Sequence, residues 1–163
     1  MKSNQKIKII AEIGWNHMGK MNLAKKMIEE AAKAGADYCK FQTWSTKNLA
    51  KGPWDNDGRF QIYKKAELTE KNYKFLIKTC KQNKVKFLTS VFNQKYLKLL
   101  KPLKLKTIKV ASMEINNFPL LTEMNRMFEN IIVSTGASKL EEVKNVFKYV
   151  NKKKCILMHC VSA

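Results

Sequence analysis

Short runs of apolar residues alternate along the chain with longer segments in which apolar residues recur every three or four positions. The short runs fit strands that are buried on both faces, whereas the spacing in the longer segments fits one face of a helix. We predict strands at 7–13, 37–43, 85–92, 107–112, 130–136 and 155–160, and helices at 22–35, 69–83, 93–101, 117–128 and 138–152. This strict alternation of strand and helix predicts an α/β fold with a parallel sheet.

Residues at the ends of the predicted helices support these boundaries. Gly35 ends the first helix and Thr69 caps the second, while Ser138 and Glu141 predict a capping box for the last one. Two layouts fit the pattern, an open doubly wound sheet and part of a (β/α)8 TIM barrel. No glycine-rich phosphate loop follows the first strand, which disfavours a dinucleotide-binding sheet.

Length and apolar content narrow the class of protein. With 163 residues, of which 45% are hydrophobic, the chain can form one domain with a sizeable core. No apolar run approaches the ~18 residues of a membrane span, and the basic N-terminus lacks the apolar centre of a signal peptide. We therefore expect a cytoplasmic protein with no membrane partner. The four cysteines lack metal-type spacing, so we expect them to be reduced and largely buried.

The formal net charge of +19 raises the question of nucleic-acid binding. Only Arg59 and Arg126 among the 32 basic residues are arginine, the residue that nucleic-acid readers favour. The lysines are spread along the predicted helices rather than gathered in one arm. We therefore predict a solvated, lysine-rich surface and no nucleic-acid partner, although such a surface attracts anionic substrates over a distance.

Polar residues interrupt the predicted strands at or near their carboxyl ends. Two of the interruptions are lysines, Lys40 and Lys109. Burying an unpaired ammonium group is costly, so we expect both lysines to meet at one edge of the sheet and hold a phosphate or a carboxylate between them. The other polar residues at the strand ends are Glu12, Gln42, Thr89, Ser90, Ser112, Glu114, Ser134, Thr135, His159 and Ser162. The hydroxyls and the amide can hydrogen-bond the anion, and a carboxylate nearby can bind sugar hydroxyls or transfer protons.

Five ordered motifs now identify a family resemblance. They are "AEIGWNHMG" (11–19), "KFQTW" (40–44), "IKVASMEINNFPLL" (108–121), "VSTGAS" (133–138) and "LMHCVSA" (157–163). In this order they resemble the N-terminal domain of the sialic acid (N-acetylneuraminate) synthases, whose relatives include the legionaminate and pseudaminate synthases. The resemblance covers the chain from about residue 8 onward. It implies a (β/α)8 barrel, present here as six strands and five helices.

The resemblance also implies an activity. These synthases condense phosphoenolpyruvate with the open-chain aldehyde of an N-acylated hexosamine, such as N-acetylmannosamine, and release phosphate. The product is a nonulosonic acid for carbohydrate biosynthesis, and a divalent metal, Mn or Mg, polarises the aldehyde. The phosphoenolpyruvate site would be lined by Lys40, Gln42, Ser90, Lys109, Ser112 and Ser134.

The remaining roles are also carried over by motif. Glu12 and Glu114 would lie near the sugar and the reacting carbons, with Glu12, Lys40 and Lys109 the candidate catalytic residues, and Ser162 would face the sugar. The sequence departs from the family at "FLTSVF" (87–92), where Ser90 stands in place of a common threonine. The hydroxyl survives, so we expect an altered rather than an abolished site.

The length of the chain qualifies this activity. A barrel typically needs ~250 residues, so we expect a chain cut after the sixth strand, without the antifreeze-like C-terminal domain of the family. The resemblance places the metal-binding histidines beyond residue 163, so we assign no metal ligand to this chain, and His17 and His159 are as well explained by structural roles. We expect a homodimer or a complementing C-terminal half, and the alternative is an inactive fragment or a non-catalytic anion-binding module.

The connection at 44–67 is unusually long for a strand-to-helix connection. It concentrates aromatic and charged residues, namely Trp54, Asp55, Asp57, Arg59 and Tyr63. In relatives this loop covers the sugar side of the site, so one expectation is a lid or a partner contact. The other expectation is a surface excursion pinned by Trp54 and Tyr63.

Overall fold

The computed structural model describes residues 7–49 and 51–161, apart from the side chain of Trp54. In this part of the chain six strands form one parallel sheet in sequential order, which confirms the predicted α/β fold. The strands are β1 (Ile10–Gly14), β2 (Tyr38–Thr43), β3 (Lys86–Val91), β4 (Thr107–Val110), β5 (Asn130–Ser134) and β6 (Cys155–Met158). All six predicted strands are present, and each observed strand lies within the predicted run or within one residue of it.

Six α-helices lie within the described residues. They are α1 (Met21–Lys33), α2 (Arg59–Ala66), α3 (Glu70–Gln82), α4 (Leu97–Leu100), α5 (Phe118–Met127) and α6 (Leu140–Val146). Short 3-10 turns complete the chain: η1 (Thr46–Asn48), η2 (Pro53–Asp55), η3 (Gln94–Tyr96), η4 (Lys101–Leu103), η5 (Ser112–Glu114) and η6 (Lys152–Lys154). Within this part of the chain, every helix is too short or too polar to cross a lipid bilayer.

The chain divides into two compact units, each described by itself. The N-terminal unit comprises the residues up to Phe41 together with Ser45–Leu88, and the C-terminal unit comprises Gln42–Trp44 together with the residues from Thr89 onward. Strands β2 and β3 each contribute residues to both units.

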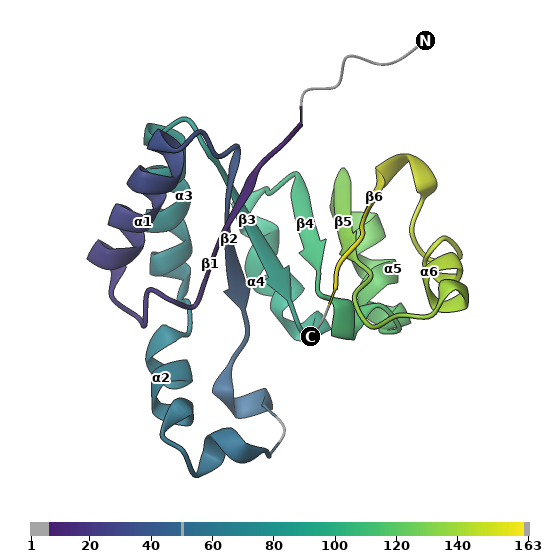
Figure 1. Cartoon of the computed structure of the whole chain (residues 1–163), viewed down its shortest axis with the longest axis horizontal. Coiled ribbons are helices and arrows are strands. Elements are labelled where there is room, and N and C mark those ends of the chain that lie inside the picture. Colours follow the sequence, from purple (N-terminus) through teal and green to yellow (C-terminus); the bar gives the residue numbers. More distant parts are fainter. Residues whose placement is uncertain (1–6, 50, 162–163) are drawn as a thin grey trace. The chain divides into compact units, whose positions relative to one another are not determined.

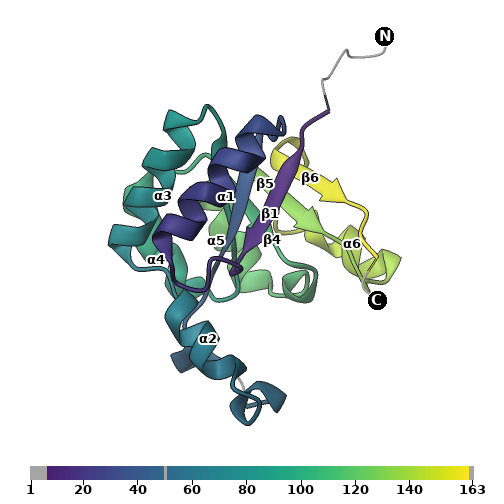
Figure 2. The same cartoon turned by 60° about the vertical axis from the view of Figure 1, so that its left-hand side comes forward.

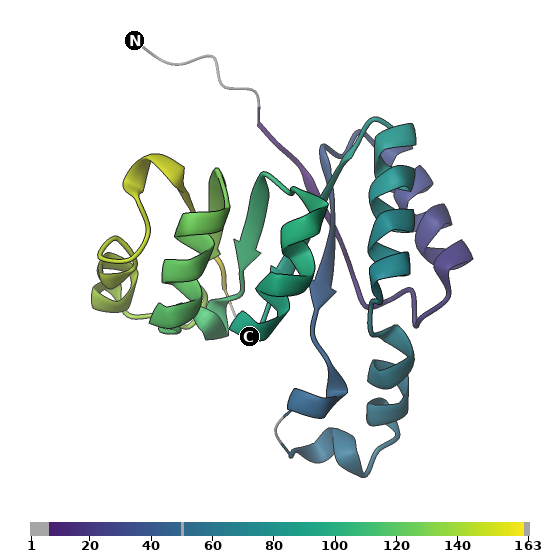
Figure 3. The same ribbon diagram turned by 180° about the vertical axis from the view of Figure 1, so that it is seen from behind.

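Aromatic packing holds the N-terminal unit together. The rings of Phe41 and Phe87 are stacked with their centroids 5.4 Å apart, and Tyr73 meets Phe87 edge-on at 6.2 Å. Helices α1 and α3 lie side by side (Figures 1 and 3) and bury Ile28 and Leu76 completely. Each fully buried aliphatic side chain stabilises the fold by about 1.5–3 kcal/mol, so this unit has a core of its own.

The first loop of the N-terminal unit approaches α2 closely at Gly19. This glycine has a φ of +79°, and a Cβ atom placed there would lie 2.1 Å from the carbonyl oxygen of Lys65. Only glycine fits both the left-handed backbone and the short approach. The ring of Trp15 in the same loop meets Tyr63 of α2 edge-on at 5.1 Å.

The long connection contains structure that the sequence analysis missed. Helix α2 lies within it, projecting beyond the end of α3 (Figures 1 and 3). The Glu67 carboxylate joins the two ends of the long connection, because it accepts hydrogen bonds from the Ser45 hydroxyl and from the Thr46 amide and hydroxyl. Asp57 pairs with Arg59 inside the connection. Glu67, Asp57 and Arg59 therefore have partners within the connection. The lid or partner contact and the surface excursion both stay predictions, and the Trp54 side chain lies outside the described residues.

In the C-terminal unit, α4 and α5 cover one face of β4 and β5 (Figures 1 and 3). Ile108, Val110, Leu120, Leu121 and Met124 are fully buried there. Strand β6 is the last strand of the sheet and runs beside β5 (Figure 2). It exposes Ile156 by 53% and Leu157 by 41%, so much of the apolar surface of β6 faces solvent.

Two predicted helices differ from the observed ones. The capping box at Ser138 and Glu141 is wrong, because the Ser138 hydroxyl donates to the Gly136 carbonyl while Glu142 accepts from the Lys139 amide. Helix α6 consequently starts two residues late, and it ends at Val146 instead of residue 152. The helix predicted at 93–101 contains one α-helical turn between two 3-10 turns, with Pro102 following.

Candidate functional site

Lys40 and Glu12 form an ion pair in the N-terminal unit. They are register partners on the parallel strands β1 and β2, and Lys40 Nζ lies 2.8 Å from Glu12 Oε2. The lysine side chain is only 3% exposed, whereas that of Glu12 is 54% exposed. The Lys40 ammonium therefore has a carboxylate partner within the protein. This corrects the sequence-based premise that burial leaves it unpaired and that a bound anion is needed to explain its position.

The exposure of Glu12 gives this ion pair an asymmetric character. Lys40 is held in place, since it also donates to the Phe41 carbonyl at 3.5 Å. Glu12 lies on the solvent side and can be rehydrated at little cost if it moves away. An incoming phosphate or carboxylate can then take over as the partner of the ammonium group. The arrangement is thus suited to exchanging one anion for another.

A second group of donors lies in the C-terminal unit, on three neighbouring strands. Lys109 of β4 donates a hydrogen bond from Nζ to the hydroxyl of Ser134 on β5. Ser90 of β3 is the register partner of Lys109. Both serines are almost completely buried, and Lys109 is half-buried. An ammonium group flanked by two hydroxyl-bearing strands at their carboxyl ends can bind an anion through charge and hydrogen bonds together.

Ser112 and Glu114 lie just after β4 but have different partners. The Ser112 hydroxyl accepts a hydrogen bond from the Gly136 amide at 3.0 Å, which joins the turn after β4 to the loop after β5. Glu114 Oε2 accepts from Asn117 Nδ2 at 2.7 Å, at the start of α5. A pocket of about 300 Å³ is lined by Ser112 and the loop after β5. The structure therefore groups Ser112 with the β5 loop and engages Glu114 at a helix start.

The other predicted site residues differ in burial, and one of them is not described. Gln42 is half-buried at the end of β2 in the C-terminal unit. His159 is exposed immediately after β6, and Ser162 lies outside the described residues. Lys40 and Lys109 belong to different units, so their convergence on one anion stays a prediction.

His17 has a structural role in the loop after β1. Its side chain is 1% exposed, its Nδ1 accepts a hydrogen bond from the Gly19 amide at 3.1 Å, and its ring lies against Phe41. Burial lowers the pKa of His17 below its ordinary value, because the charged imidazolium loses hydration. The neutral ring thus anchors the loop, which agrees with the structural interpretation of this histidine.

The described residues do not form a metal site. No group of three or more His, Cys, Asp or Glu side chains comes together in residues 7–49 and 51–161 in a way that could hold an ion. Structural and catalytic sites for zinc-like metals need at least three protein ligands, and hard cations need several oxygens.

Comparisons with known proteins place these residues in context. The chain is 36% identical to N,N'-diacetyllegionaminic acid synthase of Campylobacter jejuni, with 97% of this chain and 52% of that protein covered. It is 33% identical to N-acetylneuraminate-9-phosphate synthase of Drosophila melanogaster, with 95% and 45% covered, and 30% identical to pseudaminic acid synthase of Helicobacter pylori, with 96% and 50% covered. The chain spans about half the length of these curated relatives.

A solved structure shows the same fold. The crystal structure of N-acetylneuraminic acid synthetase from Leptospira borgpetersenii, in complex with citrate, matches with a TM-score of 0.86 and 32% identity, over 98% of this chain and 56% of that one. The six-stranded α/β sheet therefore matches part of a sialic acid synthetase, as the sequence motifs predicted. Because the NeuB family model matches residues 27–163, this chain belongs to the NeuB family.

Proposed function

We propose that this chain provides the phosphoenolpyruvate-binding half of a nonulosonic acid synthase. The observation that carries the proposal is the donor group of the C-terminal unit, in which Lys109 bonds to Ser134 and is in register with Ser90. The related synthases make legionaminic, pseudaminic and sialic acid derivatives. A dianionic enol phosphate is a substrate that such an ammonium and hydroxyl group can bind.

The proposed reaction joins two substrates. The methylene carbon of phosphoenolpyruvate forms a bond to the aldehyde carbon of an open-chain, N-acylated hexosamine. Water adds to the carbon that bears the phosphate, and inorganic phosphate leaves, which gives an α-keto acid. In this proposal Lys109 and Lys40 bind the anionic groups, and Gln42, Ser90, Ser112 and Ser134 hydrogen-bond to them. Glu114 and Ser162 would bind the sugar substrate, and the divalent metal would be held by residues that follow the matched region in the family.

Glu12 has a defined place in this proposal. In the absence of substrate it neutralises Lys40, at 2.8 Å. When phosphoenolpyruvate takes its place at the ammonium group, the carboxylate is released next to the reacting carbons. A carboxylate that is freed only when substrate binds is well suited to proton transfer, because it then lies beside the reacting carbons without its ammonium partner.

We propose that turnover requires the other half of the synthase fold, which pairs with the edge of the sheet at β6. The relatives are about twice as long as the matched region, and β6 exposes Ile156 and Leu157. An edge strand with exposed apolar side chains is a ready surface for another strand. We propose that the complementing C-terminal half occupies this edge. The alternative occupant is a second copy of the chain, and the phosphate-release experiment below distinguishes the two.

Calorimetric titration with phosphoenolpyruvate tests binding. We expect Lys109→Met to weaken binding strongly, and the matched control Lys106→Met to leave it unchanged, because Lys106 is 76% exposed and pairs with Glu129 at 3.3 Å. Equal affinities of wild type and Lys109→Met would remove Lys109 from the site.

Phosphate release tests the chemistry. The chain is mixed with a polypeptide corresponding to the C-terminal half of a relative, and with phosphoenolpyruvate, N-acetylmannosamine and Mn²⁺. Phosphate release that needs both polypeptides supports the synthase. Tight binding of phosphoenolpyruvate without any release in the mixture favours the non-catalytic anion-binding module, and a stable homodimer that excludes the second polypeptide would show that β6 pairs with itself.

A further inference from the structure

A basic groove lies in the C-terminal unit between α5 and the segment η3–α4–η4. It consists of two adjoining hollows of about 530 Å³ and 330 Å³, which share Lys101, Glu123 and Met127. We refer to these two hollows together as the α4/α5 groove. It is formed by helices, whereas the proposed substrate-binding residues lie at the ends of strands, so it is a separate feature of this unit.

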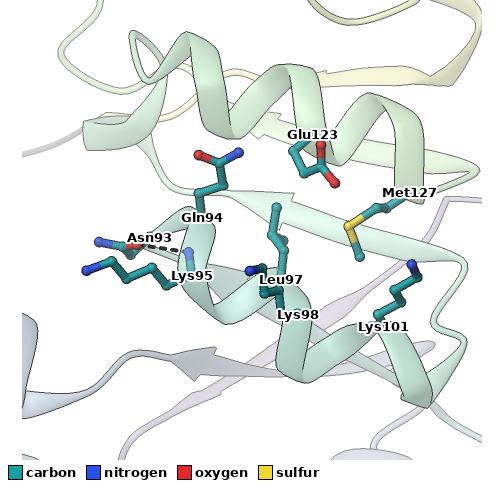
Figure 4. A pocket seen from close by; sticks show the side chains of 8 residues that line it. All are labelled: Asn93, Gln94, Lys95, Leu97, Lys98, Lys101, Glu123 and Met127. Carbon is teal, nitrogen blue, oxygen red and sulfur yellow. Dashed lines mark hydrogen bonds between the residues drawn. The ribbon is translucent and has the colours of Figure 1, made fainter.

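The floor of the groove is apolar. In Figure 4 the side chain of Leu97 points from α4 toward α5, where Met127 and Glu123 point back toward it. Leu97 is 1% exposed and Met127 is half-buried. The second hollow continues this lining with Leu100 and Phe128. Leu97, Leu100 and Phe128 are 1%, 1% and 4% exposed, so the apolar surface that a ligand can reach is that of the half-buried Met127 and of the methylene stems of the lysines.

The rim of the groove is strongly cationic. Lys95, Lys98 and Lys101 line the first hollow, and Lys101, Lys104 and Arg126 line the second. Glu123 is the single carboxylate in either lining, and it lies 3.6 Å from Arg126. Within residues 7–49 and 51–161, the side chains of the four lysines make no ion pair. Their repulsion is relieved when acidic groups line up opposite them.

The exposure of these cations indicates the kind of ligand. All four lysines and Arg126 are exposed, so the groove offers no buried donor of the sort that holds a small phosphorylated metabolite. The segment from Gln94 to Leu103 spans roughly 15–20 Å, which matches about three to four turns of a helix. An amphipathic helix places apolar anchors along one face at three- and four-residue spacing and can carry charges on both sides of them.

We propose that the α4/α5 groove binds an acidic amphipathic helix of a partner protein. Its apolar side chains would pack on Met127 and on the methylene stems of the lysines, and its carboxylates would face Lys95, Lys98, Lys101 and Lys104. The inference does not depend on the proposed synthase activity, because none of the groove residues belongs to the proposed substrate site.

Fluorescence anisotropy tests the proposal with a labelled synthetic peptide of about 15 residues. The peptide carries leucines at three- and four-residue spacing and glutamates elsewhere. A second peptide has serine in place of every leucine, and a third has lysine in place of every glutamate. We expect only the first peptide to bind, and we expect its affinity to fall as salt is added.

Charge-reversal variants locate the site. Lys98→Glu with Lys101→Glu should weaken binding by about tenfold or more. The control is Lys78→Glu with Lys81→Glu on α3, two exposed lysines with the same spacing, which produces the same change in net charge. Thermal melting of both double variants checks that the fold is retained.

Several results would overturn the proposal. Equal losses in the two double variants would show that binding follows net charge alone. Binding of the serine peptide as tightly as the leucine peptide would show that the apolar floor is not used. Tighter binding of a DNA duplex than of the acidic peptide, lost in the groove variant, would assign the groove to nucleic acid instead.

Discussion

The ion pair between Lys40 and Glu12 makes a sharp prediction about stability. The Lys40 side chain is only 3% exposed. Replacing Glu12 by Gln leaves its ammonium group without a carboxylate partner. Removing one partner of a buried ion pair typically costs about 3–5 kcal/mol. Glu12 is half exposed, so water can approach the vacated position, and we expect a smaller loss of about 1–3 kcal/mol in the free energy of unfolding.

Replacing the other partner should have a different effect. In Lys40→Met the buried ammonium group is gone, the methionine fills similar space, and Glu12 becomes fully hydrated at the surface. We expect stability within about 1 kcal/mol of wild type, or a gain. The double variant should resemble Lys40→Met and not the sum of the two changes, because no uncompensated charge remains.

Urea unfolding of the four proteins measures these differences. In a chain of this size each kcal/mol also lowers the melting temperature by roughly 2–4 °C, which gives a second readout. Unchanged stability in Glu12→Gln, together with a larger loss in Lys40→Met, would refute the reasoning. It would show that the carboxylate does not neutralise the buried ammonium group.

Three further predictions concern the N-terminal unit. Burial lowers the pKa of His17, so the folded state favours the neutral ring. The stability that this provides should be fully present above the ordinary histidine pKa of about 6.5 and should fall as the pH drops below it. Melting temperatures between about pH 5 and 8 should show this dependence in the wild type and lose it in His17→Gln. Gly19→Ala should lower the free energy of unfolding by about 2–5 kcal/mol, because the new Cβ meets the Lys65 carbonyl. Gly35→Ala should lower it by only about 1–2 kcal/mol, because Gly35 has a φ of +86° but open space around its Cβ position. Equal losses in urea unfolding would contradict the close approach at Gly19. Glu67→Ala should speed tryptic cleavage in the long connection several-fold, since it removes the hydrogen bonds that tie the ends of the connection together; an unchanged cleavage rate would argue against this anchor.

Elements with strong local signals were predictable from the sequence. Helix α3 begins where Thr69 predicted it, because the Thr69 hydroxyl accepts from the Asn72 amide and the Asn72 side chain accepts from the Thr69 amide. The strands were predictable because β-branched and apolar runs of four to six residues fit only a buried sheet at this spacing. Helix α2 was missed since it lacks a continuous apolar face and buries only Ala66.

The positions of the candidate residues on strands could be predicted from the sequence, but their interaction partners could not. The sequence placed Lys40 and Lys109 on strands, but the carboxylate opposite Lys40 depends on the register of β1 with β2, which a single strand does not encode. The sequence did contain a signal for this ion pair, because Glu12 and Lys40 interrupt two successive apolar runs with charges of opposite sign. The bond between Lys109 and Ser134 follows from the pairing of neighbouring strands in the same way.

The outer strand β6 has a practical consequence for anyone who handles this protein. Its exposed isoleucine and leucine, Ile156 and Leu157, form an apolar surface onto which further chains can pack. Concentrated samples should therefore tend to self-associate, and kosmotropic salts should accelerate this. A charged replacement such as Ile156→Lys should keep the protein dispersed, at the expense of the same surface that a complementing polypeptide would use.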